Sequence, residues 1–158
     1  MTSEPTCSRF YGRRKGRPLR KGMQALLNDM LPTLRYDAKR LPAAQFESAT
    51  GPQVELALEI GFGGGEHLAD LAEANPKTNF IGAEPFVNGV ASLLRHIQTR
   101  QLSNIRIWDD DVRLIMQALP LSGLSQVFIM FPDPWPKKRH AARRILQPEM
   151  MNTLAQLI

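Results

Sequence analysis

Four short apolar segments, separated by stretches with helical periodicity, constrain the fold of this chain more than any other feature. The apolar segments predict strands at residues 54–60, 79–84, 104–108 and 125–131. The stretches between them predict helices at residues 66–74, 87–99 and 112–119. Strands that alternate with helices are typical of a parallel sheet built from βαβ units. We therefore expect an α/β fold with a doubly wound, mostly parallel, Rossmann-like sheet.

After the fourth predicted strand, the sequence continues into a predicted helix at residues 148–158 and ends there without a fifth strand. In a doubly wound sheet the later strands lie beside the fourth strand, so residues 125–131 would form a bare apolar edge. Such edges favour pairing with other strands. We therefore expect the chain to be a truncated form of a longer protein, with the last strands missing.

The region before the first strand divides into two parts. Residues 1–20 form a basic arm that we expect to be flexible, because glycine and proline interrupt it. Residues 21–53 are expected to hold a short helix at 21–31, ended by Pro32, and then a linker. Residues 54–158 are left as the main domain.

The charges are unevenly distributed, although 20 basic and 15 acidic residues give a net charge of only +5. Residues 1–40 hold ten basic and three acidic residues, residues 41–136 hold five and eleven, and residues 137–158 hold five and one. The net charges of these blocks are therefore +7, −6 and +4. Blocks of one sign are typical of surfaces or tails that bind polyanions, so nucleic acid is the first candidate partner.

Several other classes of protein do not fit. No apolar stretch approaches the roughly 20 residues of a membrane-spanning helix, and the N-terminus lacks the apolar core of a secretory signal. Cys7 is the single cysteine, which suits a reducing compartment. We expect a cytoplasmic location, with an Arg-rich organelle presequence as the weaker alternative. The three histidines lack the spacing of metal ligands, so no metal is expected.

A glycine-rich turn, with glycine at positions 61, 63, 64 and 65, follows the first predicted strand. One interpretation is that the turn only reverses the chain. Its place between a strand and a helix instead favours a site for a nucleotide-type cofactor. The dinucleotide fingerprint requires glycine where Glu66 stands. The acids Glu59 and Glu66 would repel a pyrophosphate and attract the sulfonium and ammonium of S-adenosyl-L-methionine. Glu84, 23 residues after Gly61, is placed to bind ribose hydroxyls.

Three aspartates, Asp109 to Asp111, follow the third predicted strand. Helix capping explains one of them. The others lie at the carboxyl end of a strand, where they can reach an adenine amino group.

The fourth strand leads into Pro132-Asp133-Pro134-Trp135-Pro136, followed by five basic residues and a histidine within eight positions. The prolines restrict the backbone and hold Asp133 in place, and Trp135 offers a stacking face. We expect this loop at the switch point between the first and fourth strands, where open α/β sheets bind ligands.

The stretches EIGFGGGEH, GAEPFVNGVASLL and FPDPWPKKRHAARR, with the arm RFYGRRKGRPLR, resemble the bacterial tRNA (guanine-N7-)-methyltransferase family. The resemblance implies a class I methyltransferase fold. It also implies transfer of a methyl group from S-adenosyl-L-methionine to N7 of a guanine in the tRNA variable loop, which leaves S-adenosyl-L-homocysteine. The family's C-terminal strands and its Thr-x-Phe-Glu motif have no counterpart in this sequence.

The resemblance assigns roles to the carboxylates and to the basic residues after Trp135, the turn indicates the glycines, and the charge distribution indicates the arm arginines. Asp133 would be the catalytic residue. The cofactor would be bound by Glu59, Gly61, Gly63, Gly65, Glu84, Asp111 and Asp133. The tRNA would be bound by Arg13, Arg14, Arg17, Lys137, Arg139, His140, Arg143 and Arg144.

Two other functions stay open. Asp133-Pro134-Trp135 partly matches enzymes that methylate exocyclic amino groups of nucleobases. The chain could also be an RNA-binding module without catalysis. The sequence does not indicate an oligomeric state or a preference among tRNAs.

Overall fold

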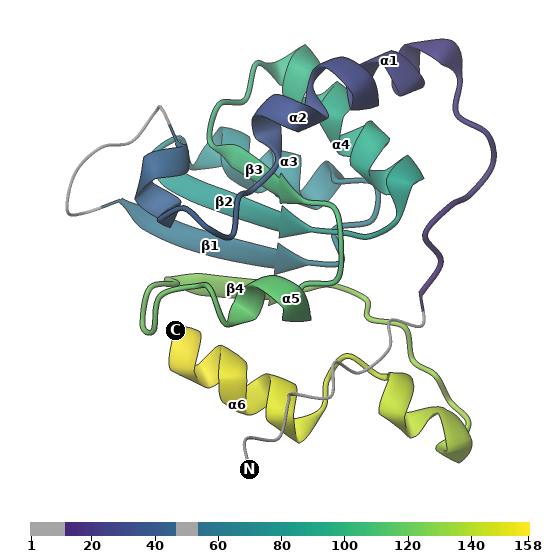
Figure 1. Ribbon diagram of the computed structural model, residues 1–158, viewed down its shortest axis with the longest axis vertical. Coiled ribbons are helices and arrows are strands. Elements are labelled where there is room, and N and C mark those ends of the chain that lie inside the picture. Colours follow the sequence, from purple (N-terminus) through teal and green to yellow (C-terminus); the bar gives the residue numbers. More distant parts are fainter. Residues whose placement is uncertain (1–11, 47–53) are drawn as a thin grey trace.

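The computed structural model describes residues 12–46 and 54–158, and four parallel strands form its single sheet (Figure 1). The strands are β1 (Glu55–Ile60), β2 (Thr78–Ala83), β3 (Ile105–Trp108) and β4 (Gln126–Ile129), in the order β3-β2-β1-β4. β1 pairs in parallel with both β2 and β4. The predicted α/β parallel sheet is confirmed, with strand ends shifted by one or two residues.

Helices cover both faces of the sheet, as a doubly wound fold requires (Figure 1). They are α3 (Glu66–Ala74), α4 (Val87–Arg100), α5 (Arg113–Met116) and α6 (Pro148–Leu157). Successive side chains of β1 point to opposite faces. Leu56, Leu58 and Ile60 share one core with α5 and α6, whereas Ala57 belongs to the core under α3 and α4.

The N-terminal helix differs from the prediction of one helix ended by Pro32. α1 (Lys21–Asp29) is followed by a second short helix, α2 (Leu31–Leu34), and Pro32 lies in the first turn of α2. Proline fits there because a first-turn N–H has no partner within the helix. α1 packs along α4 (Figure 1).

Two 3-10 helices, η1 (Pro42–Gln45) and η2 (Lys138–Arg143), were not predicted. η1 lies within the predicted linker, and the neighbouring Phe46 is buried in the core under α5 and α6. Helix α5 is shorter than the predicted 112–119, because residues 117–119 continue as tight turns ahead of Pro120.

β4 lies at one edge of the described sheet, and its side chains are more exposed than those of β1. Phe131, just beyond it, is 93% exposed. No helix within residues 12–46 and 54–158 is long and apolar enough to cross a membrane.

Candidate cofactor and substrate site

A pocket of about 950 Å³ lies at the carboxyl ends of β1, β2 and β4, next to α5 and α6. This is the switch point of the sheet, because β1 lies between β2 and β4. Its volume suits a small-molecule ligand. Four of the predicted cofactor residues line it: Gly61, Glu84, Asp111 and Asp133.

The glycine turn at the end of β1 has a left-handed backbone at three positions. The φ angles are 72° at Gly61, 58° at Gly63 and 83° at Gly65, which residues with a side chain rarely adopt. A Cβ at Gly61 would meet no atom within 4 Å, so the backbone there is open to the pocket. A Cβ at Gly65 would lie 2.7 Å from Cβ of Leu93 in α4. The turn therefore gives access to the backbone on one side and close helix packing on the other.

Glu84 joins the ends of β1 and β2 through its carboxylate. Oε2 accepts a hydrogen bond from the backbone N–H of Gly63 (2.9 Å), and Oε1 accepts one from Phe86 (3.0 Å). Burial raises the pKa of Glu84, while these two hydrogen bonds lower it and the charge of Asp133 raises it further. Each carboxylate oxygen can accept a second hydrogen bond. Glu84 therefore keeps acceptor capacity for a ligand in the pocket.

Glu59 lies behind the turn and is not among the residues that line the pocket. Its side chain is 1% exposed, and its Oε2 lies 3.0 Å from Nδ1 of His67 in α3. The His67 ring packs edge-on against Phe128. Burial raises the pKa of Glu59, and the contact with His67 lowers it. Gly63 and Gly65 are also outside the pocket lining.

Each of the three aspartates after β3 is bound by an arginine. Arg35 donates two hydrogen bonds to Asp109, at 2.7 and 2.8 Å, and this contact raises the pKa of Arg35. Arg14 donates to Asp110 at 2.7 Å.

Asp111, which is 7% exposed, is bound by the guanidinium of Arg113 and accepts the backbone N–H of Arg113 at 3.0 Å. Only Asp111 of the three lines the pocket. Sequence reasoning missed Arg35 and Arg113.

The Pro-Asp-Pro-Trp loop forms the opposite side of the pocket, through Phe131, Pro132, Asp133 and Trp135. Phe131 and Trp135 have positive φ angles of 47° and 39°. Asp133 is exposed and has no hydrogen-bond or ion-pair partner among the described residues.

The Trp135 ring contacts two of the residues that follow it. The Arg143 guanidinium lies 5.1 Å from the ring centroid, and His140 packs edge-on at 5.7 Å. Arg144 donates to the Trp135 carbonyl at 3.1 Å. These contacts fold η2 back against the loop.

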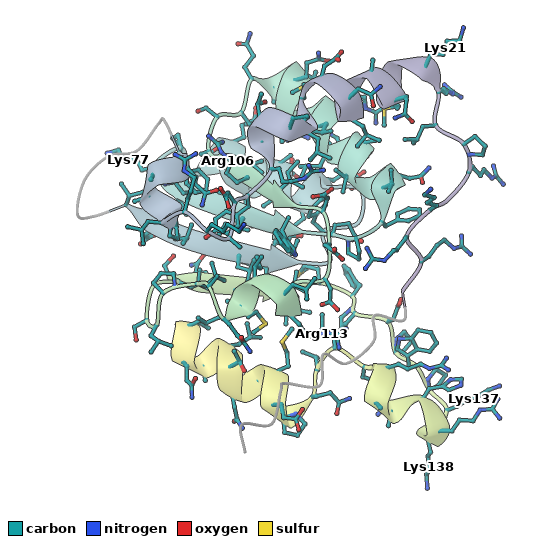
Figure 2. All side chains as sticks on the ribbon, in the orientation of Figure 1. Lys21, Lys77, Arg106, Arg113, Lys137 and Lys138 are labelled. Carbon is teal, nitrogen blue, oxygen red and sulfur yellow. The ribbon has the colours of Figure 1, made fainter. Side chains whose placement is uncertain are left out.

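The predicted tRNA-binding residues fall into two groups. Arg13, Arg143 and Arg144 line the pocket. The other five lie outside the lining: Arg14, Arg17, Lys137, Arg139 and His140. Figure 2 shows the Lys137 side chain, with that of Lys138, pointing away from the rest of the molecule.

The described part of the basic arm lies against the first turn of α4. The Val87 N–H donates to the Arg14 carbonyl at 2.9 Å. Asn88 accepts the Gly16 N–H at 2.9 Å and donates to the Arg17 carbonyl at 2.8 Å. Gly12 and Arg13 consequently reach the pocket lining. Asn88 carried no signal in the sequence, because its partners lie 71 and 72 residues away.

Comparison with known proteins gives consistent results. The protein family described as "Putative methyltransferase" matches residues 53–158. The tRNA (guanine-N(7)-)-methyltransferase of Paramagnetospirillum magneticum is 49% identical over 95% of this chain and 64% of its own length. The protein of that name from Rhodospirillum rubrum is 46% identical over 100% of this chain and 64% of its own length. The protein of that name from Caulobacter vibrioides is 47% identical over 95% of this chain and 65% of its own length.

The chain thus spans slightly less than two-thirds of the length of these relatives. The family match covers both the glycine turn and the Pro-Asp-Pro-Trp loop, which form the two sides of the pocket. The chain therefore belongs to this methyltransferase family.

Proposed function

We propose that this chain transfers a methyl group from S-adenosyl-L-methionine to N7 of a guanine in the variable loop of tRNA, and releases S-adenosyl-L-homocysteine. One observation carries the proposal: a single pocket at the switch point brings together Glu84, Asp111 and Asp133 with Arg13, Arg143 and Arg144. Carboxylates suit a cationic cofactor, and arginines suit a phosphate backbone. Since its substrate is tRNA, we expect the protein to act in the cytoplasm.

The residues of the pocket fit the cofactor. The open backbone at Gly61 allows close approach, and Glu84 has acceptor capacity for the two ribose hydroxyls. Asp111 would accept a hydrogen bond from the adenine amino group. Gly63 and Gly65 would shape the turn, and Glu59 would act from behind it, where its charge favours a cation nearby. The bound cofactor supplies an electrophilic methyl group on its sulfonium.

Asp133 would position and stabilise the target base. N7 of guanine carries a free lone pair, so its attack on a methyl group requires no general base. Alignment of the base then accounts for much of the rate. The methylated guanine is cationic, and a carboxylate at its edge would stabilise the growing charge more in the transition state than in the ground state. Phe131 and Trp135 offer aromatic faces on the same side of the pocket.

A modified substrate tests the proposed reaction. A tRNA that carries 7-deazaguanine at the target position lacks the attacking nitrogen, so methyl transfer should be abolished. The unmodified transcript is the control. An enzyme for exocyclic amino groups would methylate both tRNAs, and this outcome would contradict the proposal.

Titration calorimetry with S-adenosyl-L-methionine addresses the second alternative. We expect binding in the micromolar range that is typical of enzyme substrates. No cofactor binding together with retained tRNA affinity would identify an RNA-binding module instead.

A further inference from the structure

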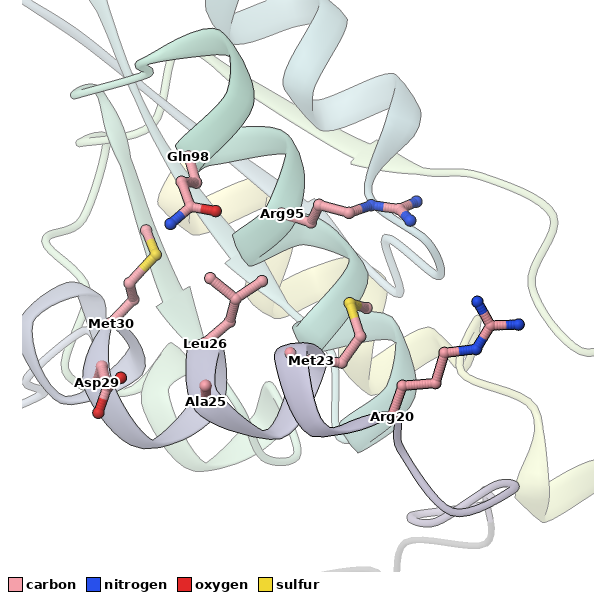
Figure 3. A pocket seen from close by; sticks show the side chains of 9 residues that line it. Arg20, Met23, Ala25, Leu26, Asp29, Met30, Arg95 and Gln98 are labelled. Carbon is pink, nitrogen blue, oxygen red and sulfur yellow. The ribbon is translucent and has the colours of Figure 1, made fainter.

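A second depression, of about 540 Å³, lies between α1 and α4, away from the candidate site (Figure 3). Its floor contains three half-buried apolar side chains: Met23 and Leu26 from α1, and Met30 directly after it. Arg20, Asp29, Arg95 and Gln98 form its polar surroundings. We call it the α1–α4 groove.

The positive charge of the groove is concentrated at one end. In Figure 3 the Arg20 and Arg95 side chains extend toward the same end, with Met23 between them, whereas Asp29 lies at the other end. Both arginines are exposed, and neither guanidinium has a hydrogen-bond or ion-pair partner among the described residues. Arg100, on the same helix as Arg95, is instead bound to Asp70 at 2.6 Å and to Glu73 at 3.2 Å.

The basic arm connects this groove to the pocket. Residues 12–22 contain six basic residues and no acidic one. Arg13 lines the pocket and Arg20 lines the groove. Between them, Arg14, Gly16 and Arg17 are hydrogen-bonded to α4. Figure 1 shows the arm running from α1 past the carboxyl ends of the strands. Residues 13–20 can span at most about 25 Å, a distance that a short run of nucleotides can cover.

We propose that the α1–α4 groove binds the sugar–phosphate backbone of the tRNA, away from the methylated guanine, with Arg20 and Arg95 on phosphates. The proposal rests on the proposed function, because the arm joins the groove to a pocket that would hold a tRNA base. One guanidinium can bind two oxygens of a phosphate at once. The apolar floor of the groove can contact the sugars between the phosphates. An acidic polypeptide would also be attracted, but nothing would lead it toward the pocket.

The salt dependence of tRNA binding tests the groove. Affinity of the full chain for a tRNA transcript is measured by fluorescence anisotropy between about 50 and 200 mM KCl, the range in which phosphate contacts are most visible. Arg20→Ala and Arg95→Ala should each weaken binding several-fold and reduce the slope of log K against log salt by about 1. In the double variant this slope should be reduced by about 2. Arg95→Lys keeps the charge and should keep the slope.

Arg100→Ala is the matched control, because it removes a charge from α4 that already has acidic partners. Its slope should equal that of the unmodified chain. An unchanged slope in the double variant, while the unmodified chain still methylates N7, would overturn the groove assignment alone. Poly-glutamate serves as a second probe in the same assay. If the double variant no longer binds poly-glutamate but keeps the tRNA slope of the unmodified chain, the groove would bind an acidic polypeptide and the assignment would be overturned. Absence of N7 methylation by the unmodified chain would instead contradict the proposed function.

Discussion

The two walls of the pocket are held in place by different means. The cofactor wall, formed by Gly61, Glu84 and Asp111, follows the ends of β1, β2 and β3, and its carboxylates are buried and hydrogen-bonded. The substrate wall, formed by Phe131 to Trp135, is largely exposed and follows the edge strand β4. Prolines and the Arg143–Trp135 contact restrain it. We infer that the first wall determines cofactor affinity, and that the second determines the position of the base and thus turnover.

The largest effect should come from the substrate wall. Asp133→Ala should lower single-turnover methyl transfer about 100-fold or more, the size expected when a group that stabilises transition-state charge is removed. Cofactor affinity, measured by titration calorimetry, should change less than about threefold. Asp133→Asn keeps hydrogen bonding without the charge, and its rate of methyl transfer should lie between those of the unmodified chain and the alanine variant. Unchanged turnover in the alanine variant would remove Asp133 from the mechanism.

On the cofactor wall, Glu84→Gln should act on binding. The amide has a single oxygen acceptor, so it cannot serve both backbone N–H groups and a ribose. We expect about a tenfold loss of cofactor affinity, which corresponds to about 1.4 kcal/mol, with turnover at saturating cofactor largely kept. Glu55→Gln, at the opposite end of β1, is the control. Affinity equal to that of the unmodified chain would show that Glu84 only shapes the turn.

The smallest effect should come from replacing Glu59, which lies behind the cofactor wall, and it should be an effect on the stability of the fold. Glu59 is nearly fully buried and its pKa is raised, so its ionisation opposes folding. Glu59→Gln keeps an acceptor for His67 and should stabilise the protein by about 1 kcal/mol near neutral pH, or about 2–4 °C in Tm.

The pH dependence of that gain follows from the sign of the shift. A group whose pKa is raised on folding loses its stabilising contribution as pH rises from its ordinary value, 4.5 for glutamate, through the raised one. The Tm difference between Glu59→Gln and the unmodified chain should therefore be present at pH 8 and disappear below about pH 4.5. A difference that persists at low pH, measured by thermal denaturation, would show that the carboxylate charge is not its cause.

Much of the fold and the centre of the site could be predicted from the sequence. Apolar segments separated by helical periodicity indicate the strands of a parallel sheet, and the ends of those strands indicate where Gly61, Glu84 and Asp133 lie. These positions depend on local patterns, which the sequence displays directly.

The side-chain partners could not be predicted in this way. Arg14 and Asp110 are 96 residues apart, and Arg35 and Asp109 are 74 apart, so no periodicity relates them. The positive φ angles of Phe131 and Trp135 also carry no sequence signal, because such angles usually mark glycine.

The hydrogen bonds between the basic arm and α4 have a consequence for the entropy of RNA binding. Fixing the backbone of one residue costs about 1–2 kcal/mol in conformational freedom. Arg14, Gly16 and Arg17 are already hydrogen-bonded to α4 before any RNA arrives, so for these residues the loss belongs to folding and does not weaken the complex. The arm would thus meet the tRNA as a preformed edge, rather than as a tail that must order itself on contact.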